Sequence, residues 1–225
     1  MHFQGVFAYD NESIANLFKK YFSSVFSDSS VSESNDSLNN VSLNYLPSKV
    51  HVSPTKIQNS IKNMKSSFFP RTDGIPSAFI KNTSTELILP LHILFNKSIT
   101  ESKSHEIWKS STITPIYKTG DRNCIEKYRP IKIINAVFSL LDDIISNRLY
   151  NHCSKDISTK QHGFVRGKST TSNLLIHSHN IVTAICKRAQ YDTVYTDFKK
   201  AFDLVNHKIL INKLRNLDLP VYIIN

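Results

Sequence analysis

The sequence has few cysteines, few glycines and no long apolar run, and each shortage excludes a class of protein. The three cysteines, Cys124, Cys153 and Cys186, are scattered and form no Cys-x-x-Cys pair, so we expect neither a disulfide framework nor a zinc site. Only 5 of the 225 residues are glycine, which excludes a collagen-like or linker-like chain. No stretch is long and apolar enough for a membrane span, and the N-terminal residues do not form a signal peptide. The sequence therefore predicts an intracellular protein outside the membrane.

Positive charge, in contrast, is plentiful and unevenly placed. The formal net charge is +10. Residues 61–225 hold 24 Lys and Arg against 13 Asp and Glu, whereas residues 1–60 hold 4 against 5. Such an excess attracts polyanions, among which nucleic acid is the commonest partner. A solvated basic surface that keeps the protein soluble explains the charge equally well.

Periodicity predicts a mostly helical chain that contains a β-hairpin. Helices are expected within residues 11–26, 53–64, 73–82, 84–100, 136–150, 170–187 and 207–217. From Ser23 to Asn44, 13 of 22 residues are Ser or Asn, which is typical of a flexible linker. Segments 111–117 and 129–135 are expected to pair as strands, and 191–198 to form one further strand. This order of elements indicates an α+β fold.

The stretch GFVRGKST, residues 163–170, is close to the loop with which ATPases bind phosphate. That loop needs four residues between its first Gly and its Gly-Lys pair, but Gly163 and Gly167 enclose only three. The loop must also follow a buried strand, and the preceding residues are polar. A nucleotide hydrolase is therefore not expected.

Six stretches, taken in order, resemble the reverse transcriptases of non-LTR (LINE-type, jockey-like) retrotransposons. They lie between about Ile14 and Leu210, and they are IANLFKKYFSSVF, DGIPSAFIKN, LFNKSI with WKSSTITPIYKTGD, YRPIKIINAVFSLLDDIISNRL, QHGFVRGKSTTSNLL and YTDFKKAFDLVNHKIL. The resemblance implies an RNA-directed DNA polymerase with a right-hand fold. Residues 1–50 would form an N-terminal helix and linker, 51–190 the fingers, and 191–225 the start of the palm. It also implies Mg²⁺ as cofactor, and an RNA template, a DNA primer and deoxynucleoside triphosphates as partners.

One carboxylate is the candidate catalytic group. DNA synthesis uses two metal ions to stabilise the attacking and leaving oxygens, and Mg²⁺ prefers oxygen ligands. Asp197, near the end of the expected strand 191–198, can supply such an oxygen. By resemblance Asp197 is the first metal-binding aspartate of the palm, and the Phe198 carbonyl is a second metal contact. An aspartate that only ends a strand is common, however.

Three residues are candidates for binding the incoming nucleotide. Lys118 and Arg129 match the fingers residues that contact the triphosphate, for which an Arg fork and a Lys point charge are suited. Basic surface residues on a hairpin are the alternative. Phe202 matches the aromatic residue that packs beneath the sugar and excludes a 2′-hydroxyl, which favours a DNA product. An ordinary core aromatic is the alternative there.

The family uses the stretch that begins at Gln161 along the template strand. By resemblance we assign Gln161, Gly163, Phe164 and Arg166 to contact with the template. A glycine turn with a buried Phe would give the same pattern.

The chain departs from the family at three places. It has Asp142-Asp143 where the family has Glu-Lys, and His105 where the family has Pro. It also ends before the Tyr/Phe-x-Asp-Asp motif that holds the remaining metal-binding aspartates. We therefore expect a truncated polymerase that is inactive as an isolated chain. The alternative is a non-catalytic, basic nucleic-acid-binding module derived from such a polymerase.

Overall fold

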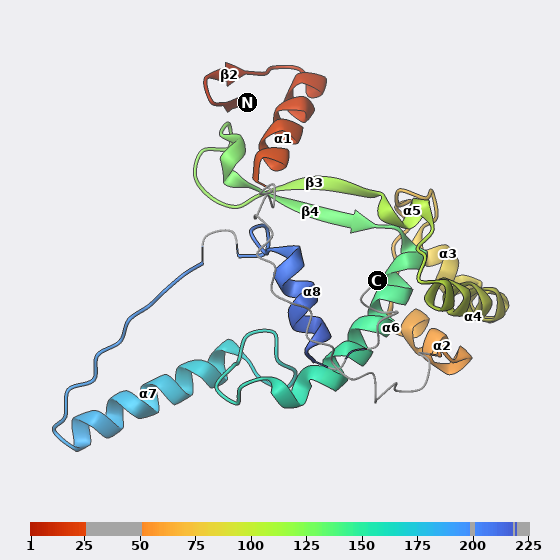
Figure 1. Cartoon of the computed structure of the whole chain (residues 1–225). Coiled ribbons are helices and arrows are strands. Elements are labelled where there is room, and N and C mark those ends of the chain that lie inside the picture. The colour runs from red at the N-terminus through yellow and green to blue at the C-terminus, as the bar shows by residue number, and fades with distance from the viewer. Residues whose placement is uncertain (26–50, 199–200, 218, 220–225) are drawn as a thin grey trace, which may run out of the picture. The chain divides into compact units, whose positions relative to one another are not determined.

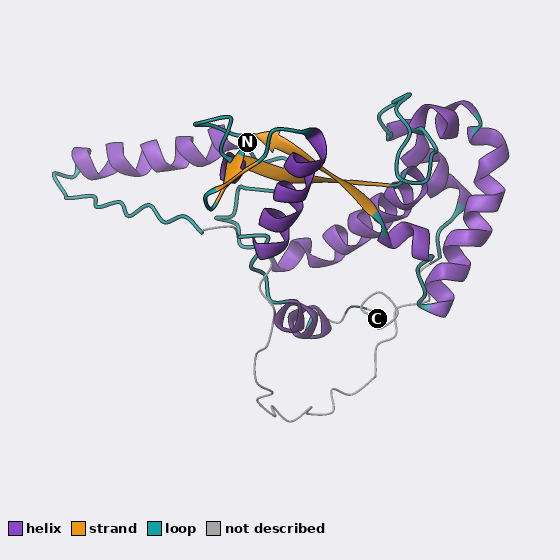
Figure 2. Cartoon of the chain, turned by 90° about the horizontal axis from the view of Figure 1, so that it is seen from above, coloured by secondary structure: helices purple, strands orange, loops and turns teal. Residues whose placement is uncertain are grey.

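A computed structural model describes residues 1–25, 51–198, 201–217 and 219 of the chain (Figure 1). The described residues combine helices with two small antiparallel sheets (Figure 2), which confirms the predicted mixed α+β class. The elements in chain order are β1 (His2–Phe3), β2 (Val6–Phe7), α1 (Asn11–Val25), α2 (Pro54–Asn63), α3 (Ser77–Asn82), α4 (Ser84–Glu101), α5 (Glu106–Lys109), β3 (Ser111–Tyr117), η1 (Ile125–Lys127), β4 (Tyr128–Ile134), α6 (Ala136–Cys153), η2 (Ser154–Asp156), α7 (Thr170–Cys186) and α8 (His207–Arg215).

Local sequence signals explain where several helices begin. At α2, the Ser53 hydroxyl accepts a hydrogen bond from the Lys56 backbone N–H, and Pro54 occupies the first helical position. Ser169 and Ser172 form a reciprocal capping box at the start of α7. The Asn206 side chain caps α8. These caps satisfy backbone N–H groups that have no partner within their own helix.

The chain divides into two compact units, one of Met1–Asn147 with Ala201–Asn225 and the other of Arg148–Lys200. The main core of the first unit gathers side chains from the five helices α2 to α6. Ile57 and Ile61 of α2, Phe95 of α4, Trp108 of α5 and Leu140 of α6 are all buried there. The Phe95 and Trp108 rings meet edge to face with centroids 6.2 Å apart. Burial of these large apolar groups is the main force that stabilises this unit.

A second apolar cluster in the first unit joins the N-terminal elements to η1. Phe3 of β1, Phe18 and Phe22 of α1 and Ile125 of η1 are buried together. Tyr21 packs against this cluster, and burial raises the pKa of its phenol, with the nearby Glu126 charge adding to the effect. The N-terminal helix therefore packs against the segment that connects β3 to β4.

The largest sheet is the β3–β4 hairpin, and its register is regular. Ser111 pairs with Ile134 at one end and Tyr117 with Tyr128 at the other. The predicted strands 111–117 and 129–135 are thus confirmed, with β4 shifted by one residue. Along a strand, side chains point alternately to the two faces, and residues directly opposite each other share a face.

The predicted strand over residues 191–198 is wrong. The whole segment is exposed and belongs to no strand. A strand needs a partner for its backbone hydrogen bonds, and neither sheet in the described residues includes this segment. The predicted Ser/Asn-rich linker lies outside the described residues, apart from its first three residues.

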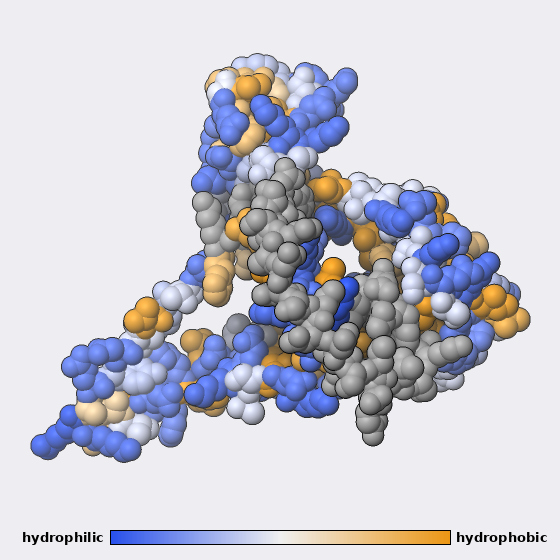
Figure 3. All heavy atoms as spheres, viewed as in Figure 1, coloured by the Kyte–Doolittle hydropathy of each residue, from blue (hydrophilic) through white to orange (hydrophobic). Residues whose placement is uncertain are grey.

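Large apolar side chains remain exposed on several elements, and Figure 3 shows separate apolar patches on one face. Leu89 and Ile93 of α4 are 64% and 59% exposed. No residue of α7 is buried, and its Leu175 is 70% exposed. Among the described residues, no helix has the length and apolar character needed to cross a bilayer.

Candidate nucleotide and nucleic-acid interface

The hairpin places the two candidate triphosphate-binding residues on one face. Arg129 of β4 pairs directly with Ile116 of β3. Lys118 follows β3, and its backbone N–H donates to the Lys127 carbonyl at 2.9 Å, which extends the ladder by one pair. Because Lys118 is two residues beyond Ile116, it shares that face with Arg129. Both side chains are exposed.

The hairpin end is the part of the β3–β4 hairpin next to its connecting loop, residues 116–118 and 127–129. Its opposite face is aromatic. Tyr117 and Tyr128 pair with each other, and their rings meet edge to face at 5.6 Å. The Tyr117 hydroxyl donates to the Gly120 carbonyl at 2.6 Å, and the Tyr128 hydroxyl donates to the Arg122 carbonyl at 3.0 Å. The Arg122 guanidinium lies 5.2 Å from the centre of the Tyr117 ring. These contacts fix the loop between the strands.

The charge of the hairpin end is positive. Between positions 118 and 129 there are four cations and two carboxylates. One carboxylate, Asp121, lies 3.8 Å from the His2 imidazole nitrogen, and the other, Glu126, accepts from the Cys124 thiol at 3.7 Å. An exposed Arg and an exposed Lys on one face form a site suited to phosphate oxygens.

Asp197 lies in the second unit, on the extended segment that follows α7 (Figure 1). Two tyrosines attach this segment to α7. The Tyr195 hydroxyl lies 3.1 Å from the His177 ring nitrogen, and the Tyr191 ring is 5.8 Å from the His177 ring. The carboxylate two residues beyond Tyr195 is exposed.

Asp197 has the right type of donor for a magnesium ion. Mg²⁺ commonly takes one or two carboxylates and completes its shell with water and substrate phosphates. Asp197 supplies one such oxygen, and the Phe198 carbonyl is adjacent in sequence. The described residues contain no group of three or more His, Cys, Asp or Glu side chains placed to hold a metal ion.

Phe202 belongs to the first unit, together with Lys118 and Arg129. Its side chain is 78% exposed. The alternative interpretation of this residue as a core aromatic is therefore wrong.

The four candidate template residues come together in one loop before α7. The Gln161 side-chain amide donates to the Gly163 carbonyl at 3.0 Å. Phe164 has a left-handed backbone, with φ of 60°, and its side chain is 91% exposed. The Arg166 guanidinium lies 4.3 Å from the centre of the Tyr150 ring, and the Arg166 N–H donates to the Tyr150 hydroxyl at 2.9 Å. Because Phe164 is exposed, the alternative of a glycine turn around a buried Phe is wrong.

The same loop does not form an ATPase-type phosphate site. The Lys168 ammonium donates to the carbonyls of Thr159 and Gln161. It thus closes the loop on itself instead of facing an open anion site. A 3₁₀ turn, Ser154–Asp156, stands where a buried strand would be required.

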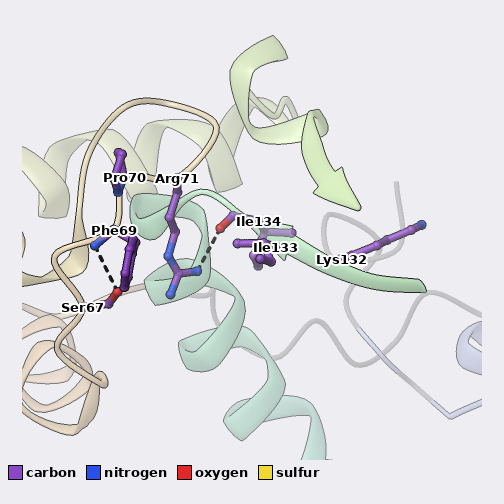
Figure 4. Close-up of a pocket in the computed structure, with 7 residues that line it drawn as sticks. All are labelled: Ser67, Phe69, Pro70, Arg71, Lys132, Ile133 and Ile134. Carbon is purple, nitrogen blue, oxygen red and sulfur yellow. Dashed lines mark hydrogen bonds between the residues drawn. The ribbon is translucent and has the colours of Figure 1, made fainter. Parts of the chain in front are cut away.

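The structure also shows a pocket that the sequence analysis missed (Figure 4). It has a volume of about 490 Å³ and is lined by Ser67, Phe69, Pro70, Arg71, Lys132, Ile133 and Ile134. The Arg71 guanidinium donates to the Ile134 carbonyl at 2.8 Å, and the Phe69 ring stands beside it, 85% exposed. An exposed ring beside a guanidinium suits a nucleobase and its phosphate. The sequence signal is the pair Phe68-Phe69 just before a basic residue in a turn.

The Asp142-Asp143 pair occupies a different environment, on α6. Partial burial raises the pKa of the Asp142 carboxyl although the side chain reaches solvent, and the Asp143 charge adds to the effect. The Asp143 carboxylate accepts hydrogen bonds from the Ser60 hydroxyl at 2.8 Å and from the Asn147 amide at 3.0 Å. These contacts give Asp143 a structural role between α2 and α6.

Comparison with known proteins identifies the family. The family described as reverse transcriptase (RNA-dependent DNA polymerase) matches residues 116–225. These residues belong to the reverse transcriptase family. The matched range includes every candidate site residue assigned from the sequence, from Lys118 to Phe202.

The chain is similar to proteins that are named as products of transposable elements. It is 29% identical over 170 residues to a protein of Drosophila melanogaster named as a probable RNA-directed DNA polymerase from transposon BS. It is 30% identical over 165 residues to a Pol polyprotein of the retrotransposable element R2 of Popillia japonica, and 25% identical over 169 residues to the polymerase of the Drosophila melanogaster mobile element jockey. These matches confirm the resemblance to non-LTR reverse transcriptases. They cover 72–73% of this chain but only 18–22% of the relatives' length.

Proposed function

We propose that this chain provides the nucleotide-binding fingers and the start of the palm of an RNA-directed DNA polymerase of a non-LTR retrotransposon. The observation that supports this most strongly is the shared face of Lys118 and Arg129 at the hairpin end. The family match alone assigns no role to either residue. Their common face gives the two cations a geometry from which both can contact one triphosphate.

In this proposal each residue has a distinct role. Arg129 binds triphosphate oxygens through its planar fork, and Lys118 adds a point charge that favours the leaving pyrophosphate. Phe202 packs beneath the sugar and discriminates against a 2′-hydroxyl. Asp197 and the Phe198 carbonyl would hold Mg²⁺, which when bound stabilises charge on the reacting phosphate.

The template strand is proposed to contact the loop of Gln161, Gly163, Phe164 and Arg166. An exposed aromatic ring and a basic side chain on one loop suit a base and its neighbouring phosphate. The pocket beside Arg71 in the first unit offers the same combination. Both features support binding of single-stranded nucleic acid.

The proposal can be tested by RNA-templated primer extension in a jockey-type polymerase whose matching segment is replaced by residues 111–217 of this chain. We expect extension that requires Mg²⁺, and a loss of roughly 100-fold or more on Asp197→Asn. Asp192→Asn is the matched control, since Asp192 is exposed on the same extended segment. Equal extension by both variants would refute the assignment of Asp197.

A non-catalytic nucleic-acid-binding module is the second candidate. The exposed Phe69 and Phe164, each near an arginine, would suffice for such binding without any polymerase chemistry. The two candidates differ in nucleotide binding. Only the polymerase requires that the hairpin end bind a deoxynucleoside triphosphate.

A further inference from the structure

The N-terminal helix α1 has no role in the function proposed so far, although its packing is specific. Its Phe18 ring meets the Tyr128 ring edge to face at 5.1 Å. Phe18 is 8% exposed, and it lies in the same cluster as Ile125 of η1. Helix α1 thus packs on the aromatic face of the hairpin end, opposite Lys118 and Arg129.

The backbone of β1 attaches to the same loop. The His2 N–H donates to the Asn123 carbonyl at 2.8 Å, and His2 forms an isolated bridge with Cys124. The Asp121 carboxylate lies 3.8 Å from the His2 side chain. Residues from the N-terminal segment therefore contact both the backbone and the side chains of the β3–β4 connection.

Tyr117 and Tyr128 connect this packing to the cations. Lys118 follows Tyr117 directly, and Arg129 follows Tyr128 directly. Neighbouring residues in a ladder point to opposite faces. A tyrosine ring that is held on one face therefore fixes the backbone from which the next side chain projects on the other face.

We infer that α1 is a positioning element for triphosphate binding, and that Phe18 is its main positioning residue. Phe18 contacts no nucleotide in this account. It holds Tyr128, and through Tyr128 the hairpin end, in the geometry that lets Lys118 and Arg129 act together. The inference rests on the proposed function, because it assumes that these two cations bind the triphosphate.

The test compares variants of the full chain in two independent assays. The first assay measures binding of a fluorescent deoxyadenosine triphosphate with Mg²⁺. The second measures amide hydrogen exchange of Lys118 and Lys127 without any ligand, because the Lys118 N–H donates to Lys127 and the Lys127 N–H donates to Cys124. The second assay depends on the packing alone.

Phe18→Ala is expected to weaken triphosphate binding roughly tenfold, since charge-assisted hydrogen bonds depend strongly on donor position. Exchange of the two amides should accelerate by about the same factor. Affinity for single-stranded RNA should change by less than about twofold, because its proposed contacts are elsewhere. Phe18→Tyr, which keeps the ring, should restore both values.

Phe22→Ala is the matched control. Phe22 is 4% exposed in the same cluster, and its ring lies tilted against those of Phe18 and Tyr21, with centroids 5.5 Å away in each case. It should lower the melting temperature as much as Phe18→Ala while changing triphosphate affinity less than about threefold. Equal effects of the two variants on affinity would overturn the inference, because they would indicate general destabilisation.

Phe18→Leu covers the case in which Phe18→Ala does not fold. It keeps a large apolar side chain in the cluster but removes the ring that meets Tyr128. We expect faster exchange at Lys118 and Lys127 and weaker triphosphate binding. Unchanged exchange in Phe18→Leu or in folded Phe18→Ala would overturn the inference. If the parent chain binds no triphosphate, the proposed function fails, and the exchange assay still decides whether α1 orders the hairpin end.

Discussion

Replacement of Phe69 by Ala should weaken binding of single-stranded RNA without destabilising the protein. The Phe69 ring is 85% exposed and forms one wall of the pocket beside Arg71. Its removal therefore exposes almost no core, and the free energy of unfolding should change by less than about 0.5 kcal/mol. The ring is, however, available to stack on a base.

The expected change in affinity follows from the free energy of stacking one base on the Phe69 ring. Stacking of one base on an aromatic side chain contributes about 1–3 kcal/mol. Its loss therefore raises Kd by roughly 5- to 150-fold. We expect the lower part of this range, because the pocket is open and the ring keeps water on one side.

Fluorescence anisotropy with a labelled RNA of about ten nucleotides at low salt measures this change. The chain supplies a closely matched control in Phe68, which is 82% exposed but does not line the pocket. Phe68→Ala should leave Kd within about twofold of the parent value. If Phe69→Ala binds as tightly as Phe68→Ala, the pocket does not bind a base.

Three further predictions concern stability. Phe95→Ala removes a fully buried ring and should lower the free energy of unfolding, measured in urea, by about 3–5 kcal/mol. A decrease below about 1 kcal/mol would show that Phe95 is not central to the core. Folding raises the pKa of the Asp142 carboxyl. The contribution of this carboxyl to the free energy of unfolding is therefore fully present below the pKa of the unfolded state, and it is lost as the pH rises through the pKa of the folded state. Asp142→Asn should therefore raise the melting temperature at pH 7 but not at pH 3, and an equal change at both would contradict this. Tyr150→Phe loses the hydrogen bond from the Arg166 N–H and should accelerate exchange of that amide, with little change at Ser172.

The helices were predictable because their signals are local. Ser53 and Pro54 start α2 where their pattern places it, and α4 continues through Pro90 as expected. The hairpin was predictable for a similar reason, since two β-type runs are separated by one polar loop. The common face of Lys118 and Arg129 then follows from the register, which the sequence does not specify to one residue.

Features that depend on distant partners were not predictable. The strand expected at 191–198 failed because β propensity does not supply a pairing partner. The Arg71 pocket joins residues 63 positions apart through the bond to the Ile134 carbonyl, and no periodic pattern indicates that contact. The sequence also does not indicate that Phe164 is exposed, because a Phe beside glycine can be buried or can project from the turn.

We propose that one face of the β3–β4 hairpin binds the triphosphate of the incoming nucleotide. The most direct test is the Kd of a Mg²⁺–deoxynucleoside triphosphate complex for Arg129→Gln and Lys103→Gln. Both substitutions remove one exposed positive charge from the first unit, but Lys103 lies before α5, outside the hairpin and outside the Arg71 pocket. We expect roughly tenfold weaker binding for Arg129→Gln and a change below about twofold for Lys103→Gln. Equal losses in the two variants would contradict this proposal, because binding would then depend on net charge and not on the face of the hairpin.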